Sequence, residues 1–474
     1  LLLWVGGFFY ANFQTRQLDD YFDDLRRQNG RELNFSAADE YFNQRGIDAN
    51  FEPYWNAALR ETEEKIEQNT TSILPALCIA SQVILGWEKS SALEKFRVEF
   101  DRAEAIWAQT DAIFASKSAL PYLPVQTSDM KGYSLIPGED GSPSNGYWFY
   151  LRDVVLFRLH LNFALSQKAQ ALQRYDEIKK IVRHALGLQP VRGEYLSAFV
   201  QKWEEELMLM LQRDWFSKEE LQEEINGINQ WLELLDTARA SGKYYNDVLR
   251  AESVRRLLNN QYLSCSKKIS GTGYGLFRLE KVEPFMGIFV RRIMLLDRNQ
   301  PDYWMGVLKN LPERKSLNYC AYLALLSEYY NDDEMNLLQV KLLAVQVILR
   351  AEQQRLASGV FPSEMSDMPK DPYYTNDPDD EYPTLCYSIS DTIISGLQIS
   401  FPKRHAHEAA EVPIRGEDQR FRAQAVQVWS VGANRVNDFN NRKNIKSDNC
   451  YSWKLEDDEG VQRVIRRKEQ ILQY

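Results

Sequence analysis

The four histidines are the first residues to examine for chemistry, and none lies in a pattern typical of a catalytic or metal site. His160 and His184 fall in helical stretches with apolar neighbours, so we interpret them as packed or surface histidines. His405, His407 and Glu408 form the one local group of metal-ligand types. They follow a proline in a charged turn and lack ligands elsewhere in the chain, so we predict no metal site there.

Two further segments have suggestive composition. The glycine-containing stretch 264–275 offers backbone N–H groups that suit phosphate, but it lacks the Lys-Ser/Thr ending of a P-loop. We interpret it as a loop between helices.

Glu204, Glu205 and Glu206 are adjacent, and adjacent side chains point in different directions around a helix, so we predict a solvated face. Since serine-nucleophile, Cys/His and HExxH signatures are also absent from the sequence, we predict no catalytic residues and a protein that is not an enzyme.

Composition limits the partners. The 474 residues carry a formal net charge of −10, and basic residues are interspersed with acidic ones throughout. Binding to nucleic acid depends on clustered Lys and Arg that contact phosphates, so we predict no nucleic-acid partner. The 17 prolines and 23 glycines leave room for long helices.

The chain begins with an unbroken apolar run from Leu1 to Ala11. A membrane span needs about 20 apolar residues, so we interpret residues 1–14 as the end of a transmembrane anchor whose first part lies upstream. Trp4 and Tyr10 suit a membrane interface. The alternatives are a signal-peptide remnant or a buried helix. Four aspartates follow before residue 25, which fits a domain facing outward.

The hydrophobic pattern has a helical period almost throughout residues 15–359, which predicts an array of antiparallel helix pairs, either tetratricopeptide-like or an irregular α-solenoid or bundle. Proline and glycine interrupt the pattern most strongly between residues 121 and 147. Helices are expected at 92–116, 148–186 with a break at Ser166-Gln167, 197–213, 217–241, 247–262 and 335–358, the last ending at Gly359. The predicted divisions are 1–14 (anchor), 15–120 (first helical region), 121–147 (loop), 148–334 (helical hairpins) and 335–474 (α+β tail).

After Gly359 the pattern changes to that of a small α+β domain. Five prolines between residues 362 and 383 exclude a continuous helix. Short β-like runs are predicted at Thr384–Ser390, Thr392–Ile399 and Ala423–Val431. A corner at Gly460 and a basic segment from Val461 to Tyr474 follow.

The order of motifs in this tail resembles the globular part of type II secretion pseudopilins. The long helix ends at Ser358-Gly359-Val-Phe361-Pro362, a Lys370-Asp371-Pro372-Tyr373 turn follows, and the final strand reads Trp429-Ser-Val-Gly-Ala-Asn434. Ser447-Asp448-Asn449 and Trp453 then end the last loop. The resemblance covers about residues 335–453. The helical body in front of such a tail is similar to a group of membrane-anchored bacterial proteins.

The resemblance implies a calcium ion in the last loop, because pseudopilins hold one there through carbonyl and acidic oxygens. Asp438 and Asp448 would be the charged ligands, helped by Asn434, Asn437 or Ser447. The family's aspartate and glycine after Gly-Ala are here Asn434 and Arg435, and a loop held by hydrogen bonds alone is the alternative.

Together these features predict a membrane-anchored protein of the bacterial cell envelope, with its soluble part facing the periplasm or the exterior. We expect it to act without catalysis, as a scaffold or accessory subunit with protein partners in a membrane-associated assembly. One alternative is a ligand-binding module with a groove between helix pairs and residues 121–147 as its lid. The other is an enzyme of unrecognised type, which convergence of His160, His184 or buried carboxylates would favour.

Overall fold

The computed structural model describes residues 20, 22–44, 80, 83, 89–108, 111, 114, 144–187, 193–258, 332–374, 381–395, 420–432, 452–455 and 458–471. These residues form helices and one antiparallel sheet, which confirms a mainly helical fold with a small C-terminal sheet. The chain divides into two compact units. The smaller one comprises Leu1–Ile47, Pro124–Ser134 and Ala240–Tyr330, and the larger one comprises the rest.

Helices α6 (Ser144–Ala164) and α7 (Lys168–Gly187) form an antiparallel hairpin, with the break where the sequence predicts it. Ser166 adopts φ +58°, and the Gln167 N–H donates to the carbonyl of Asn162 at 2.8 Å. This left-handed residue ends α6 and reverses the chain. Because α6 begins at Ser144, the end of the predicted 121–147 loop is helical.

Helix α8 (Gly193–Gln212) is followed by α9 (Lys218–Leu258), which is 41 residues long. Ser217 and Glu220 form a reciprocal capping box that starts α9: the Glu220 N–H donates to Ser217 Oγ at 3.2 Å, and the Ser217 N–H donates to Glu220 Oε2 at 2.7 Å. The prediction of two helices, 217–241 and 247–262, is wrong at the break. The helix continues because Tyr244, Tyr245 and Val248 are buried and need one continuous face.

In the smaller unit, residues 22–29 are helical and α2 (Phe35–Phe42) follows them. Asn34 caps α2 by accepting the Ala37 N–H at 2.8 Å. The ring of Phe42 lies 6.0 Å from that of Tyr245 on the second half of α9, in an edge-on arrangement. Aromatic packing therefore joins α2 to α9 within this unit.

The larger unit also contains a 3₁₀ helix, η1 (Ser90–Phe96), which leads into α4 (Arg97–Trp107). Leu93, Phe100 and Trp107 are buried at helical spacing, as the sequence predicts for residues 92–116. The ring of Trp107 lies 6.4 Å from that of Phe157 on α6. Helix α4 is thereby packed on the α6–α7 hairpin.

Helix α14 (Asp332–Ser358) carries three acidic residues in its first turn, where the helix dipole favours negative charge. Polar side chains join it to α9. Arg239 donates to Gln339 at 2.9 Å, and Gln346 donates to Asn229 at 2.7 Å. Gly359 follows with φ +82°, and its N–H donates to the Arg355 carbonyl at 2.7 Å, which confirms the predicted end of this helix.

The sheet has the strand order β1-β2-β4-β3, and every pairing is antiparallel. The strands are β1 (Cys386–Ser395), β2 (Arg420–Ser430), β3 (Ser452–Leu455) and β4 (Asp458–Ile471). Two predictions are wrong here. The separate runs 384–390 and 392–399 give one strand through Asp391, which pairs with Gln424. Gly460 is no corner, since it lies within β4 opposite Trp429 and Trp453.

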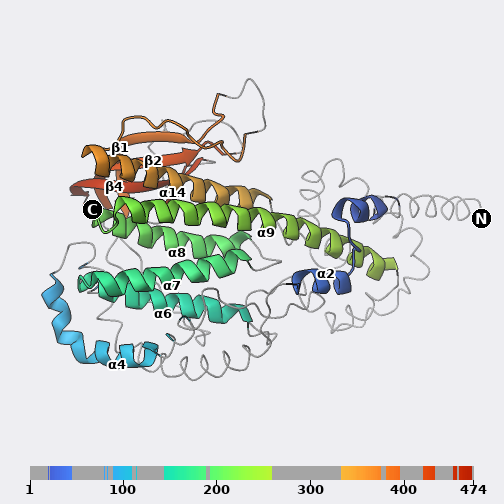
Figure 1. The fold of residues 1–474 in the computed structure, drawn as a ribbon, viewed down its shortest axis with the longest axis horizontal. Coiled ribbons are helices and arrows are strands. Elements are labelled where there is room, and N and C mark those ends of the chain that lie inside the picture. Colours follow the sequence, from blue (N-terminus) through green and yellow to red (C-terminus); the bar gives the residue numbers. More distant parts are fainter. Residues whose placement is uncertain are drawn as a thin grey trace, which may run out of the picture. The chain divides into compact units, whose positions relative to one another are not determined.

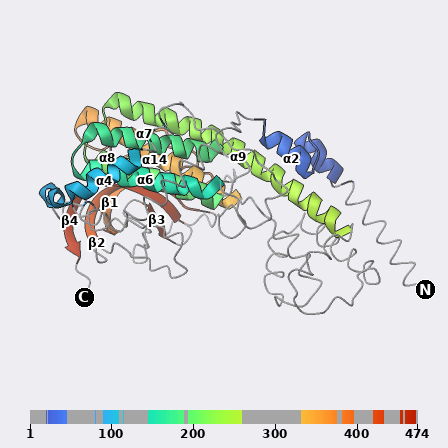
Figure 2. The ribbon, with the colours of Figure 1, turned by 90° about the horizontal axis from the view of Figure 1, so that it is seen from below.

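Helix α14 lies against β2 and β4, and α8 contacts both α14 and β4. Figure 1 shows α14, the first half of α9, α8, α7 and α6 following one another beside the sheet, and Figure 2 shows the curved sheet with helices on one face. Residues 425–430 of β2 and Val431 just beyond it are all buried, so the side chains on both faces of this strand are removed from water. The C-terminal sheet is thus built onto the helices of the larger unit.

Two glycine substitutions test the assigned backbone conformations, one just beyond the end of α14 and one inside α9. Gly359→Ala should lower the free energy of unfolding by about 1 kcal/mol, because φ +82° is unfavourable for a residue with Cβ. Gly227→Ala, inside α9, should raise it by about 0.5–1 kcal/mol, since an added Cβ there meets nothing within 4 Å. Chemical denaturation measures both, and equal effects of one sign would contradict the assigned conformations.

Candidate functional site

Helix α8 contains the densest group of buried titratable residues in the part of the chain that the structure describes. Residues Trp203 to Leu211 are buried without interruption, and Glu204, Glu205 and Glu206 are 0%, 4% and 1% exposed. The predicted solvated face is therefore wrong. It assumed that one side of α8 meets water, whereas α7, α14 and β4 all contact this helix.

His160 of α6 meets the last of these glutamates. His160 Nε2 lies 2.6 Å from Glu206 Oε1, and the histidine is 5% exposed. His160 Nδ1 and Glu206 Oε2 make no hydrogen bond among the described residues. His184 is also buried, so both histidines are packed, as interpreted from the sequence. A buried carboxylate needs a partner of this kind, and the pair joins α6 to α8.

A second polar chain crosses from α8 through α7 to α9. The Trp203 Nε1–H donates to Tyr175 Oη at 2.9 Å, and the Tyr175 hydroxyl donates to Glu224 Oε2 at 2.9 Å. Lys179 Nζ donates to the other oxygen of Glu224 at 2.6 Å. Trp203 also lies edge-on to Trp231 of α9, at 4.7 Å between ring centroids. Three helices therefore share one hydrogen-bonded chain.

Burial shifts the protonation equilibria of this chain. It raises the pKa of Glu224 above its ordinary value, although the charge of Lys179 and hydrogen bonds from Lys179 and Tyr175 act against the shift. Burial, with the negative charge of Glu224, also raises the pKa of Tyr175 well above its usual range. For Lys179 burial acts downward, but the charge and hydrogen bond of Glu224 outweigh it and raise the pKa.

Two arginines form a third network between α4, α6 and α7. Arg158, whose side chain is fully buried, bonds to Glu104 and to Asp111 Oδ1, the latter at 2.5 Å. Arg174 lies 2.7 Å from Asp111 and 2.6 Å from Glu177. Burial alone would raise the pKa of Asp111, but hydrogen bonds and charge from both arginines lower it. Burial raises the pKa of Glu177 against the attraction of Arg174.

In the tail, the structure brings together two segments that the sequence analysis singled out separately. Ser430 Oγ, at the end of β2, donates to Asp371 Oδ2 at 2.8 Å, and the Tyr373 N–H donates to Asp371 Oδ1 at 2.9 Å. The Gly432 N–H donates to Ser430 Oγ at 3.0 Å. Asp371 is buried, so these bonds fix the 370–373 turn on the strand that ends at Ser430.

The predicted calcium ligands Asn434, Asp438 and Asp448 lie outside the described residues, as do His405, His407 and the 264–275 stretch. Within the described part of the chain, no group of three or more His, Cys, Asp or Glu side chains has the geometry of a metal site. The described helices also include none long and apolar enough to cross a membrane. The predicted anchor, residues 1–14, lies outside the residues that the structure describes.

No protein-family model, curated protein or solved structure matches this chain. The polar networks are therefore interpreted from their own geometry. His160, Tyr175, Trp203 and Glu206 are buried, and each bonds to a residue of another helix. The arrangement can fix helices relative to one another, and we interpret these contacts as the polar framework of the larger unit.

Replacement of Arg158 tests this framework. Arg158→Met keeps most of the side-chain volume but removes the fully buried cation that bonds to both Glu104 and Asp111, although Arg174 still pairs with Asp111. We expect the free energy of unfolding to fall by about 3 kcal/mol. The control is Arg27→Met, which removes an arginine that is 77% exposed and pairs with Asp24 at 2.7 Å. It should cost less than about 1 kcal/mol in chemical denaturation, and equal losses would contradict the framework.

The raised pKa of Glu224 predicts a pH dependence of stability. Because the folded state holds this proton more tightly than the unfolded state does, the contribution of Glu224 is most favourable at low pH. It declines as the pH rises above the ordinary carboxyl value of 4.5. The free energy of unfolding of the wild type, relative to that of Glu224→Gln, should therefore fall as the pH rises from 4.5 to 7.

Denaturation at several pH values measures this difference. Glu223→Gln, at the exposed neighbouring position on α9, controls for loss of a carboxylate charge. A difference between wild type and Glu224→Gln that moves in favour of the wild type with rising pH would show that the ion pair with Lys179 dominates over burial.

Proposed function

We propose that this chain is a non-catalytic, membrane-anchored protein of the bacterial cell envelope. It acts as a scaffold or accessory subunit that binds other proteins of a membrane-associated assembly. The helical body provides a fixed frame, and the C-terminal tail provides a binding surface on it.

The observation that carries this proposal is the position of α8. One face of α8 joins α6 and α7 through Glu206 and Trp203, and the same helix contacts α14 and β4 of the tail. Body and tail are therefore parts of one packed unit. A frame of this kind holds a binding surface in a set orientation, which lowers the entropic cost of association.

The tail is proposed to be a pseudopilin-like domain. A long helix packed on an antiparallel sheet supports this proposal, and so do the bonds that Asp371 makes with Ser430 and Tyr373. Those bonds connect two of the motifs on which the resemblance depends. A calcium site at Asn434, Asp438 and Asp448 remains part of the proposal, to be tested by calcium titration of the purified chain.

The tail also presents apolar side chains to solvent. Val360 is 68% exposed and Leu356 is 41% exposed, at the end of α14 and just beyond it. Val98 on α4 is exposed to a similar degree, at 73%, and serves as a matched position on the helical body. Single exposed apolar residues are common on protein surfaces, so these positions serve as probes of the contact.

A native pull-down from detergent-solubilised membranes with mass spectrometry tests the function. We expect protein partners to copurify in fixed ratio, Val360→Asp to weaken their retention, and Val98→Asp to retain them. A chain that elutes alone as a monomer would contradict the scaffold. Loss of partners in Val98→Asp with retention in Val360→Asp would place the contact on the body instead of the tail.

A further inference from the structure

The loop between the two short helices of the smaller unit contains a modification motif. It reads Glu32-Leu-Asn34-Phe-Ser36, in which a serine follows the asparagine by two positions. This is the acceptor pattern for N-linked glycosylation, which attaches a sugar chain to the asparagine amide. We propose that Asn34 is a glycan acceptor whose co-substrate is a lipid-linked oligosaccharide. The proposal rests on the proposed envelope location, because such transfer takes place outside the cytoplasm.

The residue two positions before the asparagine fits the bacterial form of this pattern. Bacterial oligosaccharyltransferases select an acidic side chain at that position, in addition to the hydroxyl after the asparagine, and Glu32 supplies the acid here. The chain has one other Asn-x-Ser/Thr stretch, Asn69-Thr-Thr71, and Glu67 precedes it at the same spacing. That second stretch lies outside the described residues, so the structural argument concerns Asn34.

The backbone of the loop presents Glu32 and Asn34 to solvent. Gly30 ends the preceding helix with φ +63°, and Asn34 adopts the extended angles φ −147° and ψ 162°. Successive residues of an extended chain point to opposite sides. Leu33 is fully buried, whereas the side chain of Glu32 is 68% exposed and Ser36 is exposed. The acid and the hydroxyl of the motif are therefore both open to solvent.

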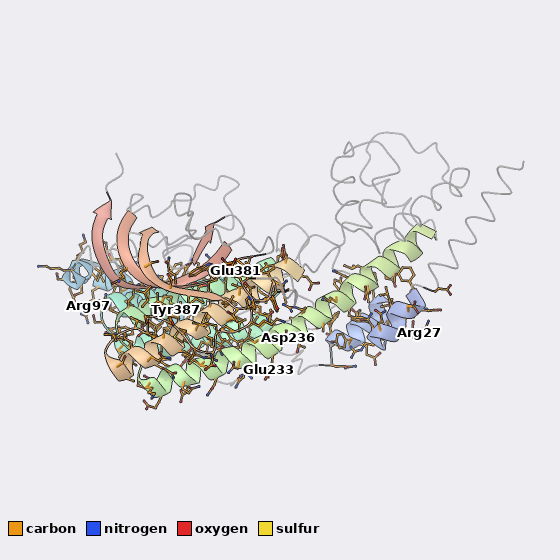
Figure 3. All side chains as sticks on the ribbon, turned by 90° about the horizontal axis from the view of Figure 1, so that it is seen from above. Arg27, Arg97, Glu233, Asp236, Glu381 and Tyr387 are labelled. Carbon is orange, nitrogen blue, oxygen red and sulfur yellow. The ribbon has the colours of Figure 1, made fainter. Side chains whose placement is uncertain are left out.

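Contacts with α9 hold the loop through its backbone and leave the motif side chains available. The Tyr244 hydroxyl donates to the backbone carbonyl of Glu32 at 2.9 Å. The Glu32 carboxylate pairs with Arg26 at 3.4 Å, and an exposed pair of this kind is weak and easily opened. Figure 3 shows the side chains of the two helices that the loop joins, with Arg27 labelled on the first of them.

The two ends of the Asn34 amide have different surroundings. Oδ1 accepts the Ala37 N–H at 2.8 Å and caps α2. Nδ2 donates to no residue that the structure describes, and it is not among the buried polar atoms that lack a partner. Since Nδ2 is the atom that receives the sugar, the glycan would extend into solvent. The modified amide retains its carbonyl oxygen, so the capping bond can re-form.

The transfer needs only the chain and the sugar donor. Asn34 Nδ2 attacks the anomeric carbon of the first sugar and loses one proton, while the bond from that carbon to the pyrophosphate oxygen breaks and polyprenyl pyrophosphate leaves. The enzyme must first draw Asn34 away from its cap. One capping bond contributes little to stability, and α2 has only eight residues, fewer than the about 12 that an isolated helix needs. The first turn of α2 can therefore open.

Glycosyl transfer to the purified full chain tests the proposal. The chain is incubated with a purified bacterial oligosaccharyltransferase and a polyprenyl-pyrophosphate-linked oligosaccharide, with a synthetic acceptor peptide as the control for enzyme activity. We expect the proteolytic peptide that contains Asn34 to gain the mass of one oligosaccharide. Mass-spectrometric sequencing distinguishes this product from modification at Asn69.

Conservative variants separate the motif from the fold. Asn34→Asp keeps a side-chain oxygen that caps a helix as well as asparagine does but lacks the amide nitrogen, so the modification should be lost. Ser36→Ala should also lose it, whereas Ser36→Thr keeps the hydroxyl and should retain it. Glu32→Gln removes the acid and should reduce the modified fraction. Thermal unfolding midpoints equal to that of the wild type confirm that the variants are folded.

The outcomes distinguish this proposal from the proposed function. A wild-type chain that stays unmodified at Asn34 while the acceptor peptide is modified would overturn the acceptor site, and so would equal modification of Ser36→Ala. Because the assay uses purified components, either result leaves the scaffold standing. A chain that is modified at Asn34 but elutes from membranes without partners would overturn the scaffold and support the acceptor site.

Discussion

The larger unit depends on the burial of charge on α8. Three consecutive glutamates point in three directions around this helix, and all three are removed from water. An isolated buried carboxylate is very costly, so each direction needs a partner from a neighbouring residue or element. Lys202 pairs with Glu205 at 2.8 Å, and His160 of α6 hydrogen-bonds with Glu206. The helices can assemble in few ways that satisfy these requirements, and this restricts their register.

The same constraint explains why the tail is continuous with the body. If one face of α8 were exposed to solvent, the glutamates on it would be hydrated. The sheet would then not pack on α8 and could move independently of the helices. Here α14 and β4 cover the side of α8 that α7 leaves open. Along α14, amide side chains such as Gln346 meet partners on α9. These directional contacts fix the position of α14, while its apolar residues are buried around it.

Local features of the fold could be predicted from the sequence, and features that depend on tertiary packing could not. The turn at Ser166 and the end of α14 at Gly359 follow from residues within one or two turns of the site. The pair of His160 with Glu206 joins residues 46 positions apart, and no local pattern specifies which buried groups meet. Charged residues also led to wrong strand boundaries in the sequence-based prediction. Asp391 reads as a turn residue and the arginines of β4 as a tail, yet ladder pairing on both sides of β2 holds them in strands.

The most direct test of the account is a double-mutant cycle on His160 and Glu206. His160→Leu alone leaves a buried carboxylate without its partner and should lower the free energy of unfolding by about 3 kcal/mol. Glu206→Met alone leaves a buried imidazole unpaired and should cost about 2 kcal/mol. The double variant replaces the pair by apolar side chains, so it should lose about 2 kcal/mol less than the sum. Additive losses, within about 0.5 kcal/mol, would contradict the claim that buried partner pairing organises these helices.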